Sequence, residues 1–174
     1  MHWAGAVGTE GADAKGPRPA DVLLVCCAGG HLLQLYLLRE AWASLDAIWV
    51  THPKDDARSL LEHEEVVWAH GPTVRNVPNL FRNLALAWTL LRRVRPSAIV
   101  TTGAGIAVPF AWLGRALGCR VVYVESLTRI DRPSLTGRLI APIANRVYVQ
   151  WPELKAALPR AVYAGSVLGS RCSR

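Results

Sequence analysis

The stretch Val22-Leu-Leu-Val-Cys-Cys-Ala-Gly-Gly-His-Leu-Leu-Gln-Leu-Tyr36 decides the fold. It begins as a short apolar run, passes through a glycine pair and continues with leucines at helical spacing, which predicts a buried strand, a tight turn and a helix. Backbone N–H groups at the start of a helix lack partners and lie at the positive end of the helix dipole. Gly29 and Gly30 let an anion approach them closely. The turn is therefore predicted to bind a phosphate or diphosphate, with His31 at its mouth as a hydrogen-bond donor or proton acceptor.

A simpler interpretation of this stretch stays open. The glycines would then only pack the helix on the strand, as in the first unit of any α/β domain. A nicotinamide-dinucleotide site fits poorly, because Ala28-Gly29-Gly30-His31 lacks the spaced third glycine and carries a bulky side chain where the backbone must be bare.

Strand and helix signals alternate along the rest of the chain. Strands are predicted at 46–51, 65–69, 97–101, 120–124, 146–149 and 161–164, and helices at 54–62, 78–94, 106–117, 134–141 and 152–158. This alternation predicts an α/β fold, a Rossmann-like parallel sheet with helices on both faces. We expect a flexible leader at 1–20, one domain at 21–168, a tail at 169–174 and no second domain.

Four polar or glycine-rich features follow predicted strands, where ligands of such sheets bind. They are the Gly29-Gly30-His31 turn, the Thr101-Thr-Gly-Ala-Gly105 turn, the pair Glu125-Ser126 and the segment Gln150-Trp-Pro152. Each also has a purely structural explanation. The glycines would only form turns, Glu125 would cap a helix, and Trp151 would fill a part of the core. Two glycine turns and a carboxylate that converge on one rim favour a functional site.

The composition limits the class of protein. The chain has 174 residues and a formal net charge of +7. No run of about 20 apolar residues is present, so no spanning helix is predicted. The four cysteines have neither a disulfide framework nor metal-ligand spacing, which indicates a reduced, cytoplasmic chain and no metal site. Between Val66 and Val124 lie seven arginines and no acidic residue, which favours an anionic partner, either nucleic acid or a membrane surface.

The predicted helix at 78–94 carries more apolar surface than one buried face requires. Trp88, Arg82, Arg92 and Arg93, with Arg75 just before the helix, suit the interface of an anionic membrane. Burial of the helix on two sides, by its own domain or by a partner, is the alternative.

Several ordered motifs extend the glycine turn into a family pattern. They are Cys27-Ala-Gly-Gly-His31, Thr102-Gly-Ala-Gly-Ile-Ala-Val-Pro109, Val122-Tyr-Val-Glu-Ser126, Ser134-Leu-Thr-Gly137 and Val149-Gln-Trp-Pro-Glu-Leu154. Together they closely resemble the Alg-fourteen-like, PssD-like oligosaccharide and polysaccharide biosynthesis family, over roughly residues 21–167. The resemblance implies the acceptor-side half of a GT-B glycosyltransferase that is split into two chains.

The resemblance also implies partners and substrates. An Alg-thirteen-like or PssE-like chain would hold most of the nucleotide-sugar donor, with a UDP-sugar expected and no covalent cofactor. The acceptor would be a polyprenyl-diphosphate-linked sugar of surface polysaccharide assembly. The protein is expected in the cytoplasm, peripheral on the inner face of the cell membrane. Eukaryotic members carry an amino-terminal membrane helix that the leader lacks, so anchoring is expected from the 78–94 helix or the partner. No RNA- or DNA-binding motif is present.

Roles for individual residues follow from this resemblance. His31 is expected to be the general base for the acceptor hydroxyl, with Glu125 as the alternative base or a residue that orients a sugar. The expected acceptor and diphosphate contacts are Gly29, Gly30, Gly103, Ala104, Gly105, Ser126 and Arg129. The expected membrane or partner contacts are Arg75, Arg82, Trp88, Arg92, Arg93, Gln150 and Trp151. A non-catalytic membrane recruiter for the catalytic chain is the alternative function.

Overall fold

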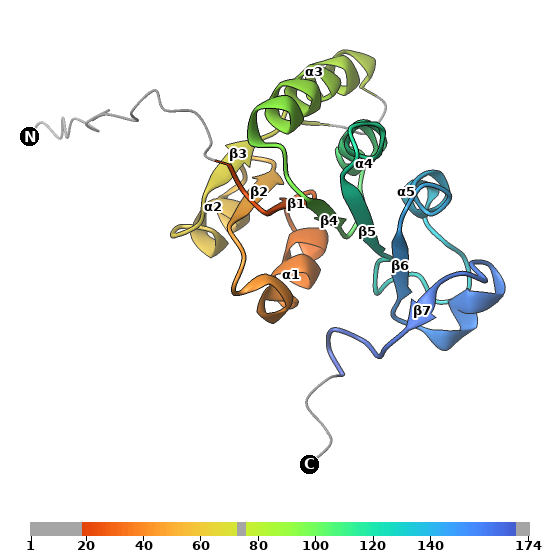
Figure 1. Ribbon diagram of the computed structural model, residues 1–174. Coiled ribbons are helices and arrows are strands. Elements are labelled where there is room, and N and C mark those ends of the chain that lie inside the picture. Colours follow the sequence, from red (N-terminus) through yellow and green to blue (C-terminus); the bar gives the residue numbers. More distant parts are fainter. Residues whose placement is uncertain (1–18, 73–75, 170–174) are drawn as a thin grey trace, which may run out of the picture.

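A computed structural model of the chain describes residues 19–72 and 76–169. Arg75, most of the expected leader and nearly all of the expected tail lie outside these residues. Seven parallel strands form one sheet in the order β3-β2-β1-β4-β5-β6-β7 (Figure 1). The strands are β1 (Val22–Val25), β2 (Ala47–Thr51), β3 (Val66–Trp68), β4 (Ala98–Thr101), β5 (Arg120–Val124), β6 (Arg146–Val149) and β7 (Val162–Tyr163).

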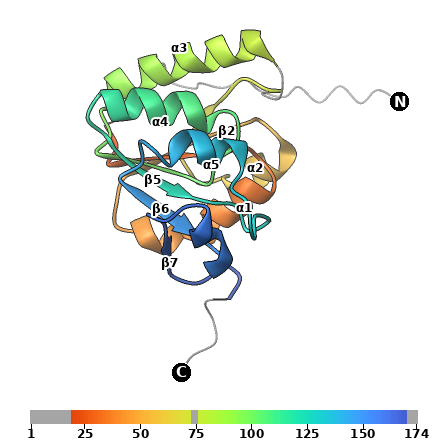
Figure 2. The same ribbon diagram turned by 90° about the vertical axis from the view of Figure 1, so that its right-hand side faces the viewer.

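Helices connect successive strands and cover both faces of the sheet. The α-helices are α1 (Gly30–Tyr36), α2 (Asp55–Leu60), α3 (Val77–Val94), α4 (Ala107–Ala116) and α5 (Leu135–Ile140), and the 3-10 helices are η1 (Arg39–Trp42) and η2 (Pro152–Ala156). The larger core cluster joins the sheet to α3, α4 and α5, which lie side by side in one layer (Figure 2). The smaller cluster packs α1, η1 and α2 against the opposite face.

Local sequence explains where the longest helix begins and ends. The Asn76 side chain accepts a hydrogen bond from the backbone N–H of Asn79 at 3.0 Å, and Pro78 occupies the first turn, where its missing N–H is harmless. Arg95 closes the helix in the left-handed conformation, at φ 52°. Val94 and Ala87 are buried against the sheet, so one face of α3 belongs to the core.

Two elements differ from the sequence prediction. The segment after Pro152 forms a 3-10 helix and not the predicted α-helix, and η1 was not predicted at all. The reason is physical: a single 3-10 turn is too short to show a helical repeat of apolar residues. Within η1, Trp42 packs edge-on against Trp49 of β2, with ring centroids 6.3 Å apart, so this turn closes the smaller core cluster.

The face that carries α1 is covered unevenly. Beside η1, an apolar groove of about 460 Å³ extends over β4, β5 and β6, with Val100, Val122 and Tyr148 among its lining residues. Within the described residues, no helix is long and apolar enough to cross a bilayer.

Candidate functional site

The two glycine turns meet at the centre of the sheet. Strands β1 and β4 are hydrogen-bonded neighbours, with Val25 opposite Thr101, so their carboxyl ends lie together. The chain leaves β1 toward β2 on one side and β4 toward β5 on the other, which makes this the switch point where ligands of doubly wound sheets bind. The sequence prediction of a shared rim is reproduced by this arrangement.

Two hydrogen bonds fasten the turns to each other. The Nδ1 atom of His31 lies 2.9 Å from the carbonyl oxygen of Thr102, and the Thr102 hydroxyl donates to the carbonyl oxygen of His31 at 2.8 Å. A carbonyl oxygen can only accept, so Nδ1 carries the proton. The neutral ring therefore has its free lone pair on Nε2, for which the described residues offer no hydrogen-bond partner. This half-buried imidazole is oriented as a proton acceptor.

The surroundings of His31 keep the ring neutral. Burial is the main cause and lowers the pKa of His31 below its usual value. The carbonyl of Thr102 and the charge of Glu125 oppose this shift, whereas the charge of Arg129 adds to it. His31, Glu125 and Arg129 are therefore close enough to act on one another electrostatically.

Glu125 occupies a different environment. The side chain is fully buried. One oxygen accepts hydrogen bonds from the Tyr123 hydroxyl at 2.8 Å and the Ser126 N–H at 2.9 Å, and the other accepts from the N–H of Ser134 at 3.0 Å and its hydroxyl at 3.2 Å. A Cβ at position 137 would collide with this carboxylate, which explains why Gly137 follows. The arrangement favours Glu125 as a positioning residue for the loop that leads to α5.

That loop carries two other predicted site residues. Ser126 is buried, and its hydroxyl pairs with the Thr128 hydroxyl at 3.0 Å. Arg129 is exposed, and its N–H donates to the carbonyl oxygen of Ser126 at 2.9 Å. The turn therefore presents the Arg129 guanidinium at the rim, while Ser126 stabilises the turn itself.

The first glycine turn already holds an internal anion. The Asp56 carboxylate accepts a hydrogen bond from the N–H of Gly29 at 2.6 Å. A diphosphate at this N–H would be repelled by the carboxylate, so the predicted role of Gly29 as a phosphate donor is not supported. This contact was not predicted, because Asp56 lies 27 residues from Gly29 in the sequence.

At the second glycine turn, no carboxylate of the described residues accepts a hydrogen bond from a backbone N–H. The N–H of Gly103 donates to the Thr101 hydroxyl at 2.9 Å, and φ values of 99° at Gly103 and 75° at Ala104 turn the chain sharply. Ala104 is half-buried and Gly105 exposed, ahead of the ten-residue helix α4. Their N–H groups have no backbone partner within the described residues, so this turn is the better anion donor.

A buried amide network, which the sequence prediction missed, supports the rim. The Gln34 side chain accepts from the N–H of Leu127 at 2.7 Å and from the Gln150 amide at 2.9 Å. Gln150 also accepts from the N–H of Val167 at 3.1 Å and is only 3% exposed. Gln150 therefore offers little surface for the contact that we expect there, because its amide makes hydrogen bonds inside the domain. No sequence signal distinguishes a network amide from a surface glutamine.

Trp151 and α3 show how the other predicted contact residues lie. The Trp151 indole N–H donates to the carbonyl oxygen of Leu127 at 2.6 Å, and its ring is half-buried. On α3, Phe81 is 63% and Trp88 45% exposed, and the Arg92 guanidinium stacks 4.9 Å from the centre of the Trp88 ring. Arg82 and Arg93 are exposed on the same helix. The helix thus has an apolar and basic outer face besides its buried one.

No group of three or more His, Cys, Asp or Glu side chains within the described residues could hold a metal ion. The arrangement offers a neutral imidazole, backbone donors and a guanidinium. These groups suit proton transfer from a hydroxyl and the binding of an anionic ligand.

Comparison with known proteins identifies the family. The family model described as "Oligosaccharide biosynthesis protein Alg14 like" matches residues 68–167. The UDP-N-acetylglucosamine transferase subunit ALG14 of Eremothecium gossypii is 36% identical over 202 aligned positions, which cover 97% of this chain and 88% of that protein. The chain belongs to the Alg14-like family. The ALG14 subunit of Rattus norvegicus is 32% identical over 124 residues, and the match covers 63% of this chain and 57% of the rat protein.

Solved structures share the fold of this Alg14-like chain. MurG of Acinetobacter baumannii superimposes with a TM-score of 0.63 at 16% identity, over 79% of this chain and 43% of that one. The UDP-GlcNAc 2-epimerase of Neisseria meningitidis, solved with UDP-GlcNAc, superimposes with a TM-score of 0.68 at 9% identity. The match covers 83% of this chain and 46% of the epimerase chain. The predicted Rossmann-like sheet, equivalent to one half of a GT-B enzyme, is confirmed.

Proposed function

We propose that this Alg14-like chain is the acceptor-binding, membrane-associated subunit of a two-chain glycosyltransferase. It would transfer a sugar from a nucleotide-diphosphate donor to a polyprenyl-diphosphate-linked saccharide in surface polysaccharide assembly. The observation that carries the proposal is the His31–Thr102 hydrogen bond, which leaves Nε2 of a neutral imidazole free at the switch point of the sheet. The names of the relatives, UDP-N-acetylglucosamine transferase subunits, supply the class of reaction.

His31 acts as the general base in this proposal. Its Nε2 takes the proton of the acceptor hydroxyl while that oxygen attacks the anomeric carbon of the donor. The bond from the anomeric carbon to the nucleotide diphosphate breaks, and the diphosphate leaves with the electron pair. This leaving group needs positive charge or N–H donors more than a proton. Glu125 holds the Ser126–Ser134 segment in place and does not exchange the proton.

The acceptor diphosphate lies near the second glycine turn. Ala104 and Gly105 offer backbone donors there, and Arg129 supplies a full positive charge. The nearby carboxylate of Asp56 directs the diphosphate away from Gly29. The N–H of Gly30 remains the donor of the first turn.

A second chain supplies the donor site. The chain covers 43% of MurG and 46% of the epimerase, each of which contains further structure beyond the matched part. The relatives are named as subunits of a transferase, which supports the same division. An Alg-thirteen-like or PssE-like chain that holds a UDP-sugar completes the enzyme in this proposal.

The outer face of α3 contacts the membrane. Phe81 and Trp88 present apolar surface there, and Arg82, Arg92 and Arg93 surround it with positive charge. Such a surface binds the interface of an anionic bilayer without crossing it. We place the protein on the inner face of the cell membrane.

The function is tested by reconstitution. The purified chain, the donor-binding chain and both together are given UDP-N-acetylglucosamine as the probe donor and a polyprenyl-diphosphate-linked sugar on vesicles. We expect transfer only when both chains are present. Robust turnover by this chain alone would contradict the two-chain proposal, and failure of both chains with any UDP-sugar would contradict the reaction class.

Membrane binding has a separate test, because the same α3 face also favours the alternative of a non-catalytic recruiter. Replacing Arg82, Arg92 and Arg93 with Glu should release the chain from anionic vesicles, since each charge near the surface contributes about 1 kcal/mol. Flotation measures the effect, with Arg120→Glu as the control. Unchanged flotation would instead indicate that the partner buries α3.

A further inference from the structure

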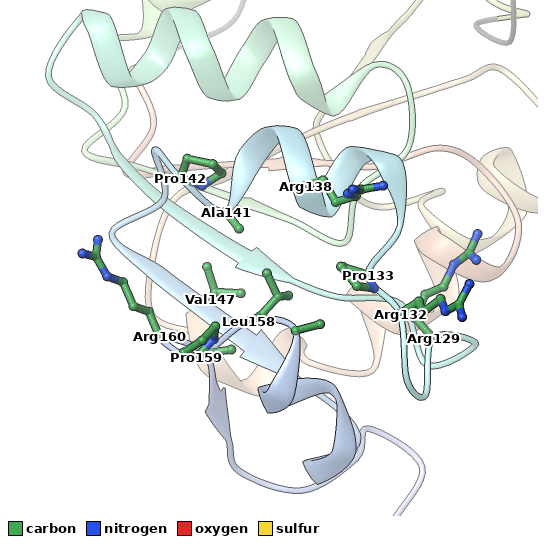
Figure 3. Close-up of a pocket in the computed structure, with 12 residues that line it drawn as sticks. Arg129, Arg132, Pro133, Arg138, Ala141, Pro142, Val147, Leu158, Pro159 and Arg160 are labelled. Atoms are coloured by element: carbon green, nitrogen blue, oxygen red, sulfur yellow. The ribbon is translucent and has the colours of Figure 1, made fainter.

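A groove of about 900 Å³ lies between α5, β6 and η2 (Figure 3). Its lining includes four arginines, Arg129, Arg132, Arg138 and Arg160, and no carboxylate. The remaining lining side chains are alanine, proline, valine and leucine, with Val147 and Leu158 between the two ends. Asp131 is close in sequence, but it does not line the groove. The groove is therefore both apolar and strongly positive.

The positive charge of this groove is not neutralised internally. Within residues 19–72 and 76–169, no guanidinium of the four arginines makes an ion pair or a hydrogen bond. A cluster of this kind repels itself and is stabilised when an anion binds. Free arginines present planar donors that match phosphate oxygens in pairs. The groove is therefore complementary to a ligand that carries phosphate.

One end of the groove opens at the catalytic rim. Figure 3 shows Arg129, Arg132 and Arg138 at this end and Arg160 at the other. Burial lowers the pKa of His31 and raises the pKa of Tyr123, and the positive charge of Arg129 acts on both groups in the lowering direction. A ligand that starts beside His31 can thus continue past three arginines and onto apolar side chains without leaving the surface.

The groove also lies beside the proposed membrane-facing layer. Helix α5 forms its wall and exposes Leu135, 73% accessible, on the layer that it shares with α4 and α3. An apolar chain could pass from a bilayer along α5 into the groove. Phosphate without an apolar body would leave the exposed Ala157 and Pro159 and the half-buried Leu158 uncovered. The lining offers no aromatic ring on which a nucleic-acid base could stack.

We propose that this groove binds the lipid part of the acceptor, an isoprenoid diphosphate. Arg129, which the proposed function already places beside the diphosphate, extends this contact into the groove with Arg132 and Arg138. The first isoprene units lie on the apolar lining toward Arg160. The inference rests on the proposed function, because the sugar attached to this diphosphate is the one that His31 deprotonates. It adds a lipid subsite to a chain whose glycine turns bind only the polar end.

The test is calorimetric titration of the full chain with farnesyl diphosphate and with inorganic diphosphate. Farnesyl diphosphate should bind at least about tenfold more tightly, because each buried CH₂ group contributes about 0.8 kcal/mol. The double variant Arg132→Glu, Arg138→Glu should lose at least about tenfold in affinity for both ligands, since charge-assisted hydrogen bonds are lost. Arg120→Glu, an exposed arginine at the start of β5, is the matched control and should bind as wild type does.

A second variant tests the apolar lining separately. Ala157 lines the groove but is exposed, so Ala157→Trp should fold and cover the apolar lining. This variant should weaken the binding of farnesyl diphosphate and leave the binding of inorganic diphosphate unchanged. Equal affinity of the two ligands would overturn the lipid subsite. Absence of binding, or equal effects of the double variant and Arg120→Glu, would overturn the groove as the site.

Turnover with the partner chain separates this inference from the proposed function. The double variant should raise the acceptor KM and leave kcat and the donor KM unchanged. If His31→Ala keeps full turnover while farnesyl diphosphate binds as expected, the groove stands and His31 is not the base. If His31→Ala abolishes turnover but the double variant leaves the acceptor KM unchanged, the proposed function stands and the groove is not the lipid site.

Discussion

His31 and Glu125 were both candidates for the base, and the structure gives them opposite environments. His31 is half-buried and uses one ring nitrogen to bind Thr102. Glu125 is fully buried and accepts four hydrogen bonds through its two oxygens. A base needs an uncommitted lone pair that the substrate can reach. The comparison therefore favours His31 for the proposed proton transfer, and Glu125 as the residue that holds the rim in place.

The largest expected effect is on turnover by His31→Ala. Removal of a general base typically lowers the rate by about 10²–10⁴-fold, and this loss should appear in kcat at saturating acceptor with the partner chain present. The unfolding free energy should fall by only about 1 kcal/mol, because one hydrogen bond is lost. His63→Ala, at an exposed histidine after α2, is the control. A loss confined to the apparent acceptor affinity would make His31 a binding residue.

Glu125→Ala should act on stability instead. It removes the acceptor of four hydrogen bonds and leaves the N–H of Ser126 buried without a partner, which should lower the free energy of unfolding by about 3 kcal/mol. The Tyr123 hydroxyl keeps its contact with the Ser134 hydroxyl at 3.1 Å. Denaturant unfolding measures this, with the exposed Glu153→Ala as the control. We expect kcat per folded molecule to stay within about tenfold of wild type. Normal stability with turnover as low as in His31→Ala would reverse the assignment of the two residues.

Thr102→Val should have the smallest effect. It removes the hydroxyl that donates to the carbonyl oxygen of His31, while the backbone carbonyl that orients Nδ1 remains. Stability should fall by about 1 kcal/mol and turnover by less than about tenfold. Thr102→Ser retains the hydroxyl and should behave as wild type in both assays. A hundredfold loss of turnover in Thr102→Val would show that the hydroxyl itself contacts the substrate.

The sequence predicted the sheet well because its signals are local. The apolar run from Val22, the glycine pair after it and the leucines at helical spacing each lie within or next to the element that they define. The resemblance added the split-enzyme interpretation. The bounds of most elements consequently differ from the prediction by one or two residues.

The site was harder to predict because its contacts span the sequence. Asp56 reaches Gly29 from 27 residues away, and Gln34 reaches Gln150 from 116 residues away. No periodicity or motif records such a contact. Gln150 is buried because of such a contact with Gln34. The Asp56 carboxylate occupies the N–H of Gly29 through another contact of this kind. The sequence identified the rim, and the fold determined which of its groups remain free.

The most direct test of the central claim is the pH dependence of turnover in wild type and in His31→Ala. Burial lowers the pKa of His31, so the reactive neutral form persists to below the usual histidine value of about 6.5. With the partner chain and saturating substrates, the wild-type rate should be constant at neutral pH and fall about tenfold per pH unit once the ring is protonated. The residual rate of His31→Ala should lack this inflection. The same inflection in both proteins would contradict His31 as the base.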